Sequence, residues 1–468
     1  MHGAMSPPVG RQPPFQRQGH AILVATMISA AVAMPCSGQV AAGQVEEHVI
    51  SATDTAQTYA LYLPPGYTPD RRWPVLFVLD PRGRALLGLE LFDDAAARHG
   101  WIILSSYNTR SDATTDPNVN AVEAMLASAQ ARLSIDPSRL YLAGFSGTAR
   151  VALRLAVALR GHVAGVIAAG GALAFELGGP ETVFAGESTF AYFGAAGTED
   201  FNYEEVLAMG DRFRTTRVPT RIAIFEGPHS WPPPGISRDA VEWLELRAML
   251  GGLRPMDSAW VRTRLDAELA RAEELYRGGR WEEALRLYEA IAHDYLRWPE
   301  ASSAERRAAE LRENRVLQRH EAERRRLAER DQRQASDLQK ALAWARSGSR
   351  PPSLQSLLKK LRIPELQRTI ERGDSLEAAS ARRLLARTFV WLAFYEPRAY
   401  LANDSPDRAL RMFEAAVTFG RIEGEGCALL NAALVAATAE QKARLIGQCP
   451  APALDRGPRG REQPRSPR

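Results

Sequence analysis

Two things are scarce in this chain of 468 residues, namely cysteine and long hydrophobic runs. Its 3 cysteines are too few for a disulfide-rich scaffold. No apolar run reaches the ~18–20 residues that a membrane-spanning helix needs, which excludes a polytopic membrane protein. The remaining composition is that of an ordinary globular protein, with 45% hydrophobic and 24% charged residues. A chain of this length holds two or three hydrophobic cores.

The charged residues are unevenly distributed along the chain. Residues 1–250 hold 19 basic and 24 acidic side chains, whereas residues 251–468 hold 40 and 31. All four lysines lie in the second of these parts. This asymmetry predicts two regions with different surfaces.

The first 38 residues have the pattern of an export signal. Arg11 and Arg17 precede the apolar stretch 21–34, and small residues surround Cys36. Such a pattern is typical of a cleaved secretory signal, and an uncleaved anchor helix is the alternative. We therefore expect residues 1–38 to be removed and the mature protein to be periplasmic or secreted, with no integral membrane span left after cleavage.

Residues 45–252 alternate between apolar strands and helices. Continuous apolar strands of this kind predict an α/β domain whose mostly parallel sheet is covered by helices on both faces. In such a sheet the functional groups lie in loops at the carboxyl ends of the strands. We predict strands at residues 59–63, 73–79, 101–106, 139–143, 163–168, 190–193 and 221–225.

One of these loops carries the sequence Gly144-Phe145-Ser146-Gly147-Thr148. A serine on so tight a strand-to-helix turn projects its hydroxyl above the edge of the sheet. The N–H of Gly147 then lies at a helix N-terminus, where it can stabilise an oxyanion. The five-residue pattern alone occurs often by chance. The strand before it and the helix after it make it more specific, and we predict that Ser146 is a nucleophile.

A serine hydroxyl needs a base to remove its proton. The predicted domain has four histidines, and His229 is the one that follows a strand ending at the same rim as Ser146. A carboxylate should orient the imidazole, and the loop after strand 190–193 offers Asp200, with Glu199 as the alternative. We therefore predict a catalytic group of Ser146, His229 and Asp200.

The strand order, the turn at Ser146 and the chain order Ser146, Asp200, His229 resemble the α/β-hydrolase fold. The resemblance covers roughly residues 50–250 and is closest to small secreted esterases and depolymerase-like hydrolases without a large lid insertion. It implies a serine hydrolase that cleaves a carboxylic ester of unknown type through an acyl-enzyme intermediate. No metal-ligand cluster or phosphate-binding glycine loop is evident, so neither a metal nor another cofactor is expected.

The chain departs from this family in two places. Thr148 stands where the family usually has glycine, and residues 80–83 replace the usual His-Gly after the third strand. That loop normally supplies the second oxyanion donor beside Gly147, and Pro81 has no N–H to give. The resemblance therefore implies that Arg82 completes the oxyanion hole, with Gly83, Tyr107 and Asn108 as alternatives.

The second half of the chain is predicted to be helical. Residues 258–346 should form a tetratricopeptide-like helix pair and a long charged helix, and residues 353–449 a further helical-repeat region. Residues 450–468 have the composition of a disordered tail. Small and aromatic residues at helix-pair spacing carry the tetratricopeptide resemblance, namely Ala272, Gly279, Ala284 and Tyr288.

Stacked helices usually present a surface to a partner, so a protein or peptide is the expected ligand of this region. Its arginines are interleaved with glutamates, which argues against nucleic-acid binding. The main alternative function is a catalytically inactive hydrolase fold that acts as a scaffold through its helical repeats. A peptidase is a third interpretation, without a recognisable peptide pocket in the sequence.

Two cysteines remain after cleavage of the predicted export signal. Cys427 and Cys449 lie at the outer ends of two predicted helices, residues 426–436 and 438–447. An antiparallel hairpin would bring these ends together, and an oxidising compartment would allow a disulfide. Two unpaired thiols are the alternative.

Overall fold

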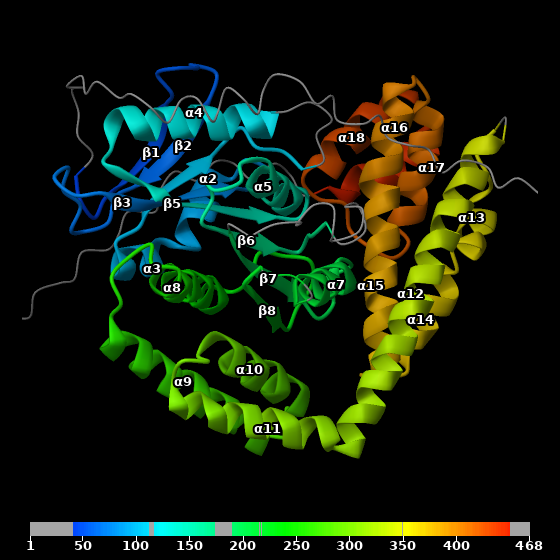
Figure 1. Cartoon of the computed structure of the whole chain (residues 1–468). Coiled ribbons are helices and arrows are strands. Elements are labelled where there is room, and N and C mark those ends of the chain that lie inside the picture. The colour runs from blue at the N-terminus through cyan, green and yellow to red at the C-terminus, as the bar shows by residue number, and fades with distance from the viewer. Residues whose placement is uncertain are drawn as a thin grey trace, which may run out of the picture. The chain divides into compact units, whose positions relative to one another are not determined.

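The structure is a computed structural model that describes residues 41–111, 117–173, 190–214, 216, 218–348 and 350–449. The predicted export signal, up to residue 38, and the predicted tail, residues 450–468, lie outside these residues. The chain divides into two compact units, Met1–Ala309 and Glu310–Arg468, each of which is described by itself (Figure 1). None of the described helices is both long enough and apolar enough to cross a membrane.

The first unit is built on an eight-stranded sheet with the order β1-β2-β4-β3-β5-β6-β7-β8. The strands β1, β2 and β4 pair in antiparallel fashion, and every later pairing is parallel. The predicted, mostly parallel sheet is thus confirmed, and the short first strand was not predicted. The strands are β1 (Val45–Ile50), β2 (Thr58–Tyr62), β3 (Trp73–Leu79), β4 (Ile102–Ser106), β5 (Ile135–Phe145), β6 (Gly165–Ala169), β7 (Ala191–Gly197) and β8 (Thr220–Phe225).

Helices cover both faces of this sheet, as the sequence predicted (Figure 1). One face packs against α4 (Pro117–Arg132), α5 (Gly147–Ala158) and α7 (Tyr203–Arg214). The other face is covered by α2 (Ala85–Glu90), α3 (Asp93–His99) and α8 (Pro234–Leu250). Because both faces are covered, the central strands read as continuous apolar runs rather than as alternating patterns.

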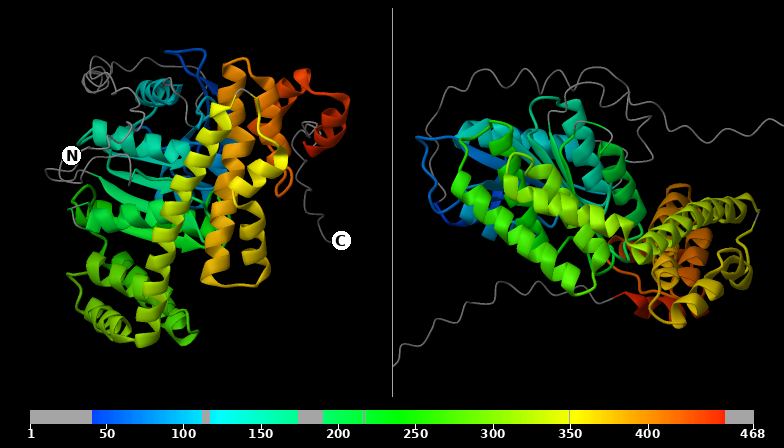
Figure 2. Two further views of the ribbon diagram at one scale, coloured as in Figure 1. Left: turned by 90° about the vertical axis from the view of Figure 1, so that its right-hand side faces the viewer. Right: turned by 60° about the horizontal axis from the view of Figure 1, so that its bottom comes forward.

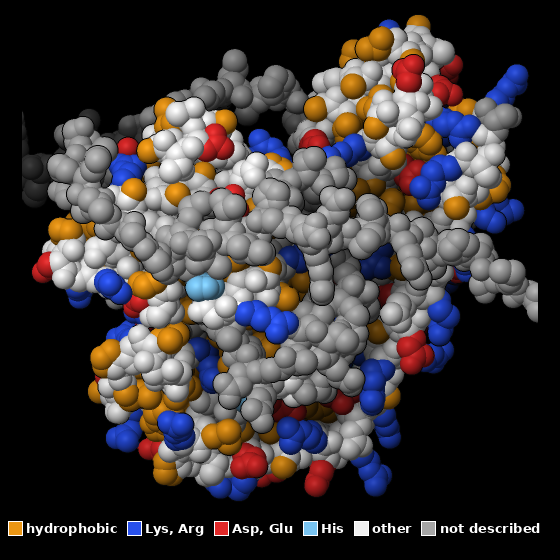
Figure 3. Space-filling view, turned by 45° about the horizontal axis from the view of Figure 1, so that its top comes forward, with side chains coloured by type: hydrophobic (Ala, Val, Ile, Leu, Met, Phe, Trp, Pro, Cys, Tyr) orange, Lys and Arg blue, Asp and Glu red, His pale blue; other side chains and the backbone are white. Residues whose placement is uncertain are grey.

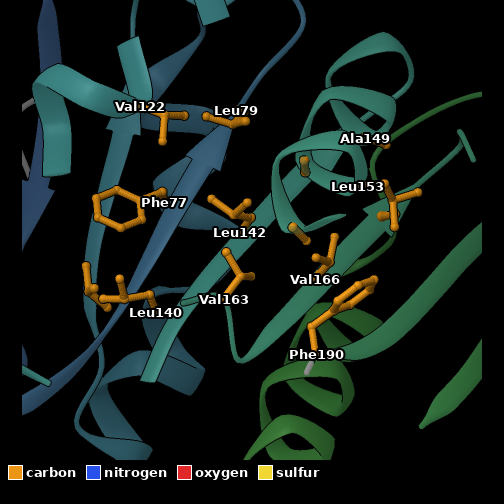
Figure 4. Packing of buried hydrophobic residues seen from close by; sticks show 14 of the residues in the cluster. Phe77, Leu79, Val122, Leu140, Leu142, Ala149, Leu153, Val163, Val166 and Phe190 are labelled. Atoms are coloured by element: carbon orange, nitrogen blue, oxygen red, sulfur yellow. The ribbon is translucent and has the colours of Figure 1, made fainter. Parts of the chain in front are cut away.

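The core between the sheet and α5 explains why these residues form these elements. Phe77, Leu142 and Val166 come from three neighbouring parallel strands and point to the same face (Figure 4). Against them α5 presents Ala149 and Leu153, which are 0% and 1% exposed. The small residue lets the helix approach closely, and each large buried side chain contributes about 1.5–3 kcal/mol. The approach places the N-terminus of α5 at the carboxyl edge of the sheet.

A helical hairpin follows the sheet within the same unit. It consists of α9 (Ser258–Arg277) and α10 (Trp281–Asp294), joined by a turn in which Gly279 has φ +75°. The predicted helix pair is therefore present, whereas its tetratricopeptide character stays a prediction. Arg221 of β8 connects the sheet to the hairpin, because its guanidinium lies 2.6 Å from Glu268 and 2.7 Å from Asp294.

The long charged segment forms two helices. The boundary between the units falls within α11 (Ser302–Glu313), and α12 (Arg315–Ser347) begins after a break at Asn314. The Asn314 side chain accepts hydrogen bonds from the N–H groups of Val316 and Leu317, which is a helix N-cap. Because Asn314 caps the start of α12, α11 ends directly before it. On the coloured part of the face in Figure 3, Lys and Arg side chains are interspersed with Asp and Glu.

The second unit packs its helices around one apolar core that includes Leu342, Leu410 and Phe413. Figure 2 shows the long α12 running beside α15. Cys427 and Cys449 form a disulfide with a Cα–Cα distance of 5.7 Å, as the predicted hairpin suggested. The helices after α12 are α13 (Leu354–Lys360), α14 (Ile363–Glu371), α15 (Leu376–Val390), the π-helical turn Trp391–Tyr395, α16 (Glu396–Ala402), α17 (Pro406–Ala416), α18 (Glu425–Ala433) and α19 (Ala439–Leu445).

Candidate active site

Ser146 lies on a sharp turn between β5 and α5. Its backbone has φ 57° and ψ −123°, a conformation that is costly for a residue with a side chain. The surroundings leave no room for larger neighbours. A Cβ on Gly144 would lie 2.4 Å from the carbonyl oxygen of Thr148, and one on Gly171 would lie 2.3 Å from that of Ser146. The glycines around the serine are therefore required by close backbone approach.

Thr148 ties this turn to the neighbouring strand. Its side chain is fully buried, and its hydroxyl donates to the carbonyl oxygen of Leu79 at the end of β3. The same oxygen accepts a hydrogen bond from the N–H of Phe145 at 3.1 Å. A glycine at this position could make neither bond. The departure from the family pattern thus has a structural reason, because the threonine fixes the serine turn to the sheet.

The three residues predicted to act together lie within hydrogen-bond distance of one another. His229 Nε2 is 2.9 Å from Ser146 Oγ, and His229 Nδ1 is 2.8 Å from Asp200 Oδ1. Asp200 follows β7 and His229 follows β8, so the carboxyl ends of three parallel strands bring the residues to one edge. An ionised carboxylate beside Nδ1 favours the tautomer in which Nδ1 carries the proton and Nε2 accepts from the serine hydroxyl. Asp200, rather than the alternative Glu199, makes the contact with His229.

Asp200 is buried, and the oxygen that contacts His229 has a second hydrogen-bond donor. Its carboxyl is 0% exposed, and Oδ1 also accepts a hydrogen bond from the N–H of Asn202 at 2.7 Å. The Asn202 amide in turn donates to the carbonyl oxygen of Gly170 at 2.8 Å. A Cβ on Gly170 would lie 2.9 Å from Asp200 Oδ2 and 3.1 Å from the His229 ring. This glycine permits the strand edge to approach the pair closely.

Aromatic rings hold the imidazole in place. The His229 ring lies 4.5 Å from the ring of Phe145 and 4.1 Å from that of Phe201. Trp231 packs on the other side of this group, 5.6 Å from Phe145. Sequence reasoning did not assign a role to any of these rings. The available signal was their position, since each lies within two residues of a predicted catalytic residue.

Two backbone N–H groups, those of Gly147 and Arg82, were predicted to form the oxyanion hole. Gly147 N–H lies at the N-terminus of α5, and no described residue is paired with it as an acceptor. The second predicted donor, Arg82, stays a prediction, and its N–H is engaged by another acceptor in this structure. Its N–H donates to the carboxylate of Asp80 at 2.8 Å, and the N–H of Gly83 donates to the Asp80 carbonyl oxygen at 3.0 Å. The side chain at position 80, which the prediction ignored, is the physical reason.

The two remaining alternatives are also occupied. The Tyr107 hydroxyl donates to the carbonyl oxygen of Glu47 at 2.8 Å, and its N–H donates to that of Thr58 at 3.0 Å. The Asn108 amide donates to the carbonyl oxygen of Ala56 at 3.0 Å. Both residues fasten β4 to the antiparallel part of the sheet, so they are structural contacts.

Within the described ranges, no group of three or more His, Cys, Asp or Glu side chains is arranged to hold a metal ion. Ser146, His229 and Asp200 contribute one hydroxyl, one imidazole and one carboxylate to a chain of hydrogen bonds at the rim. Ser146 is partly exposed, while Asp200 behind it is buried. This arrangement can activate an alcohol toward an electrophilic carbon at an open edge.

One family model and several solved structures are similar to part of this chain. Residues 101–211 match the phospholipase/carboxylesterase family of hydrolases. A fluorophosphonate-binding serine hydrolase of Staphylococcus aureus is 13% identical, with 43% of this chain and 98% of that chain covered and a TM-score of 0.37. An S-formylglutathione hydrolase from Agrobacterium tumefaciens is 15% identical, with 45% and 97% covered and a TM-score of 0.34. No curated protein matches.

The sheet order, the covered faces and this family match define an α/β-hydrolase fold followed by an all-helical region. They also support a hydrolase of the carboxylesterase kind. The family match lies entirely within the first unit and ends in α7, before His229 is reached.

Proposed function

We propose that this protein is a serine hydrolase that cleaves a carboxylic ester through Ser146, His229 and Asp200. The observation that carries the proposal is the continuous pair of contacts, 2.9 Å from Ser146 to His229 and 2.8 Å from His229 to Asp200. In the first step the Ser146 oxygen attacks the ester carbonyl while His229 Nε2 takes the hydroxyl proton. The Asp200 carboxylate stabilises the resulting imidazolium.

The tetrahedral intermediate then collapses to an acyl-enzyme. The oxyanion of the tetrahedral intermediate lies toward the N–H of Gly147, at the positive end of α5. His229 gives its proton to the leaving alcohol as the ester bond breaks. A water molecule, deprotonated by His229, attacks the acyl-enzyme, and the carboxylic acid leaves as the proton returns to Ser146. The proposed steps use only the side chains of this protein, the ester and water.

We further propose that the protein acts outside the cytoplasm. The apolar stretch 21–34 behind basic residues supports this location, and so does the Cys427–Cys449 disulfide, which needs an oxidising compartment. A protein or peptide partner for the helical region remains our proposal for that region. The alternative of a catalytically inactive scaffold is not favoured, because the hydrogen-bonded chain at the rim is complete.

Covalent labelling tests the proposed nucleophile. A fluorophosphonate should add to the purified protein in a one-to-one ratio, and peptide mass mapping should place it on Ser146. The Ser146→Ala variant should not react, whereas Ser303→Ala, a substitution in the separate helix α11, should react as the wild type does. Labelling that persists in Ser146→Ala, or that maps to a different serine, would remove the basis of the proposal.

A further inference from the structure

Asp80 is a buried carboxylate that the mechanism above does not use. It follows β3 directly and is 0% exposed. Its oxygens accept hydrogen bonds from the N–H of Arg82 at 2.8 Å, from the N–H of Arg84 at 3.2 Å and from the Arg84 guanidinium at 2.8 Å. They also accept one from the indole N–H of Trp231 at 2.9 Å. Donors thus surround the carboxylate from two different loops.

These contacts keep Asp80 ionised. Burial by itself would raise the pKa of the Asp80 carboxyl, but the hydrogen bonds from Arg84, Trp231 and the Arg82 N–H outweigh burial and hold this pKa below its usual value. A charged acceptor makes stronger hydrogen bonds than a neutral one. The connection is therefore stronger than one between neutral groups.

The two loops that Asp80 connects are those on either side of Ser146. One follows β3 and is fastened further by the Thr109 hydroxyl, which donates to the Asp80 carbonyl oxygen at 2.7 Å. The other follows β8 and contains His229, two residues before Trp231. The Trp231 ring also packs against Phe145, next to the serine, so its position and that of His229 depend on each other. Asp80 is 151 residues away from Trp231 in the sequence, and their hydrogen bond links the two loops.

We propose that Asp80 is a positioning residue: through Trp231 it holds the histidine loop in register with the serine turn, so that His229 stays within hydrogen-bond reach of Ser146. The proposal rests on the serine hydrolase function proposed above. Asp80 touches neither Ser146 nor His229, and it acts on the reaction through geometry alone. A displacement of about 1 Å in a reacting group can cost about 100-fold in rate.

The Trp231→Phe variant tests this link. It keeps an aromatic ring on Phe145 and removes the indole N–H that binds Asp80. With a p-nitrophenyl ester as substrate, we expect kcat to fall about 10- to 100-fold while KM changes less than about 2-fold. The rate of fluorophosphonate labelling at Ser146 should fall in parallel, because this reaction uses the same serine and histidine.

The matched control is Arg84→Met. This change removes the charged partner of Asp80 that lies on its own loop and leaves the bond to Trp231 in place. It should lower the melting temperature as much as Trp231→Phe does, yet leave kcat within about 3-fold of the wild type. Asp80→Asn removes the negative charge and exchanges one of the two acceptor oxygens for an NH2 donor. It should lower kcat at least as far as Trp231→Phe does. The double variant Asp80→Asn/Trp231→Phe should be no slower than Asp80→Asn alone, since both changes break one link.

Three outcomes would overturn the inference. The first is a wild-type kcat in Trp231→Phe, and the second is equal loss of kcat in Trp231→Phe and Arg84→Met. The third is a higher kcat in Asp80→Asn, which would mean that the carboxylate only withholds the Arg82 N–H from the oxyanion. In each case an inactive Ser146→Ala variant would leave the proposed hydrolase function standing. Full activity of Ser146→Ala would instead reject the function itself.

Discussion

Strand β8 has a polar cluster at each end, and the two clusters are built in opposite ways. At its start, Arg221 is 9% exposed and is bound by the carboxylates of Glu268 and Asp294. Beyond its end, His229 connects a partly exposed serine to a buried aspartate. The first cluster pairs every charge within the protein, whereas the second leaves a hydroxyl open at the rim. The cluster around Arg221 therefore holds secondary-structure elements together, whereas the cluster around His229 can take part in a reaction.

The cluster at the start of β8 fastens the α9–α10 hairpin to the sheet. Burial by itself would raise the pKa of the Asp294 carboxyl, but the charge of Arg221, together with hydrogen bonds such as that from Trp243, outweighs burial and holds this pKa below its usual value. The stability from this shift is present above the ordinary carboxyl pKa and is lost as the pH falls through the lowered value. The hairpin is therefore part of the hydrolase unit, and its attachment weakens in acid.

The comparison is tested most strongly by removing charge from the reactive cluster. Asp200→Asn should lower kcat about 10⁴-fold, because an amide favours the wrong imidazole tautomer. Its melting temperature should stay within a few degrees of the wild type, since the side chain keeps its shape. Steady-state kinetics and thermal unfolding of the same preparation measure both quantities. The exposed Asp211→Asn is the matched control, and retained activity in Asp200→Asn would assign the carboxylate to structure.

Removing charge from the fastening cluster should have the reverse result. Arg221→Met should lower the free energy of unfolding by about 3–5 kcal/mol, because two buried carboxylates lose their shared partner. Turnover per folded molecule should not change. Denaturant unfolding gives the first quantity and active-site titration the second.

A surface arginine on the same hairpin provides the control for that change. Arg271 is 55% exposed and pairs with Asp239, so Arg271→Met should cost only about 0–1 kcal/mol. Equal losses of unfolding free energy in Arg221→Met and Arg271→Met would mean that burial of the Arg221 cluster contributes nothing to stability. Loss of turnover in folded Arg221→Met would mean that the cluster at the start of β8 also affects the reaction beyond its end.

The disulfide extends the comparison to the second unit. Cys427 and Cys449 are 22 residues apart, and opening a loop of this length should cost about 3 kcal/mol in the chain-entropy account. The double variant Cys427→Ser/Cys449→Ser should therefore unfold its helical unit earlier, while ester hydrolysis by the first unit is unchanged. Differential scanning calorimetry with and without reductant measures this. A wild-type unfolding profile in the double variant would show that the bridge does not stabilise this unit.

The smallest effect concerns the bond between the serine turn and β3. Thr148→Val keeps the volume of the side chain and loses every hydrogen bond of the hydroxyl, which should cost about 1–3 kcal/mol in the free energy of unfolding. Thr148→Ser keeps the hydroxyl and should cost less than Thr148→Val. Chemical denaturation of the two variants distinguishes them, and the opposite order would show that packing rather than hydrogen bonding matters at this position.

The rim cluster could be anticipated from sequence because its members follow three parallel strands, β5, β7 and β8. Ser146, Asp200 and His229 each come after an apolar run, and parallel strands bring their carboxyl ends to one edge. The turn at Ser146 needed only local residues to be recognised. The nearness of Ser146 to Asp200 and His229 then followed from the order of the strands in the sheet.

The contacts that sequence did not reveal connect residues without any local pattern. Asp80 was considered only as a departure from a family motif, so the competition of its carboxylate for the Arg82 N–H was missed. Arg221 sits inside an apolar strand, and its partners lie on α9 and at the end of α10, which periodicity alone does not bring to it. Strand β1 was missed because four of its six residues are exposed and its composition is polar.

Turnover by Ser146→Ala tests the central claim most directly. The variant should fold with the melting temperature of the wild type and hydrolyse a p-nitrophenyl ester at least about 10³-fold more slowly, because alanine lacks the oxygen on which the acyl-enzyme forms. Turnover near the wild-type rate by folded Ser146→Ala would contradict the account, since Ser146 would then not be the nucleophile that His229 and Asp200 activate.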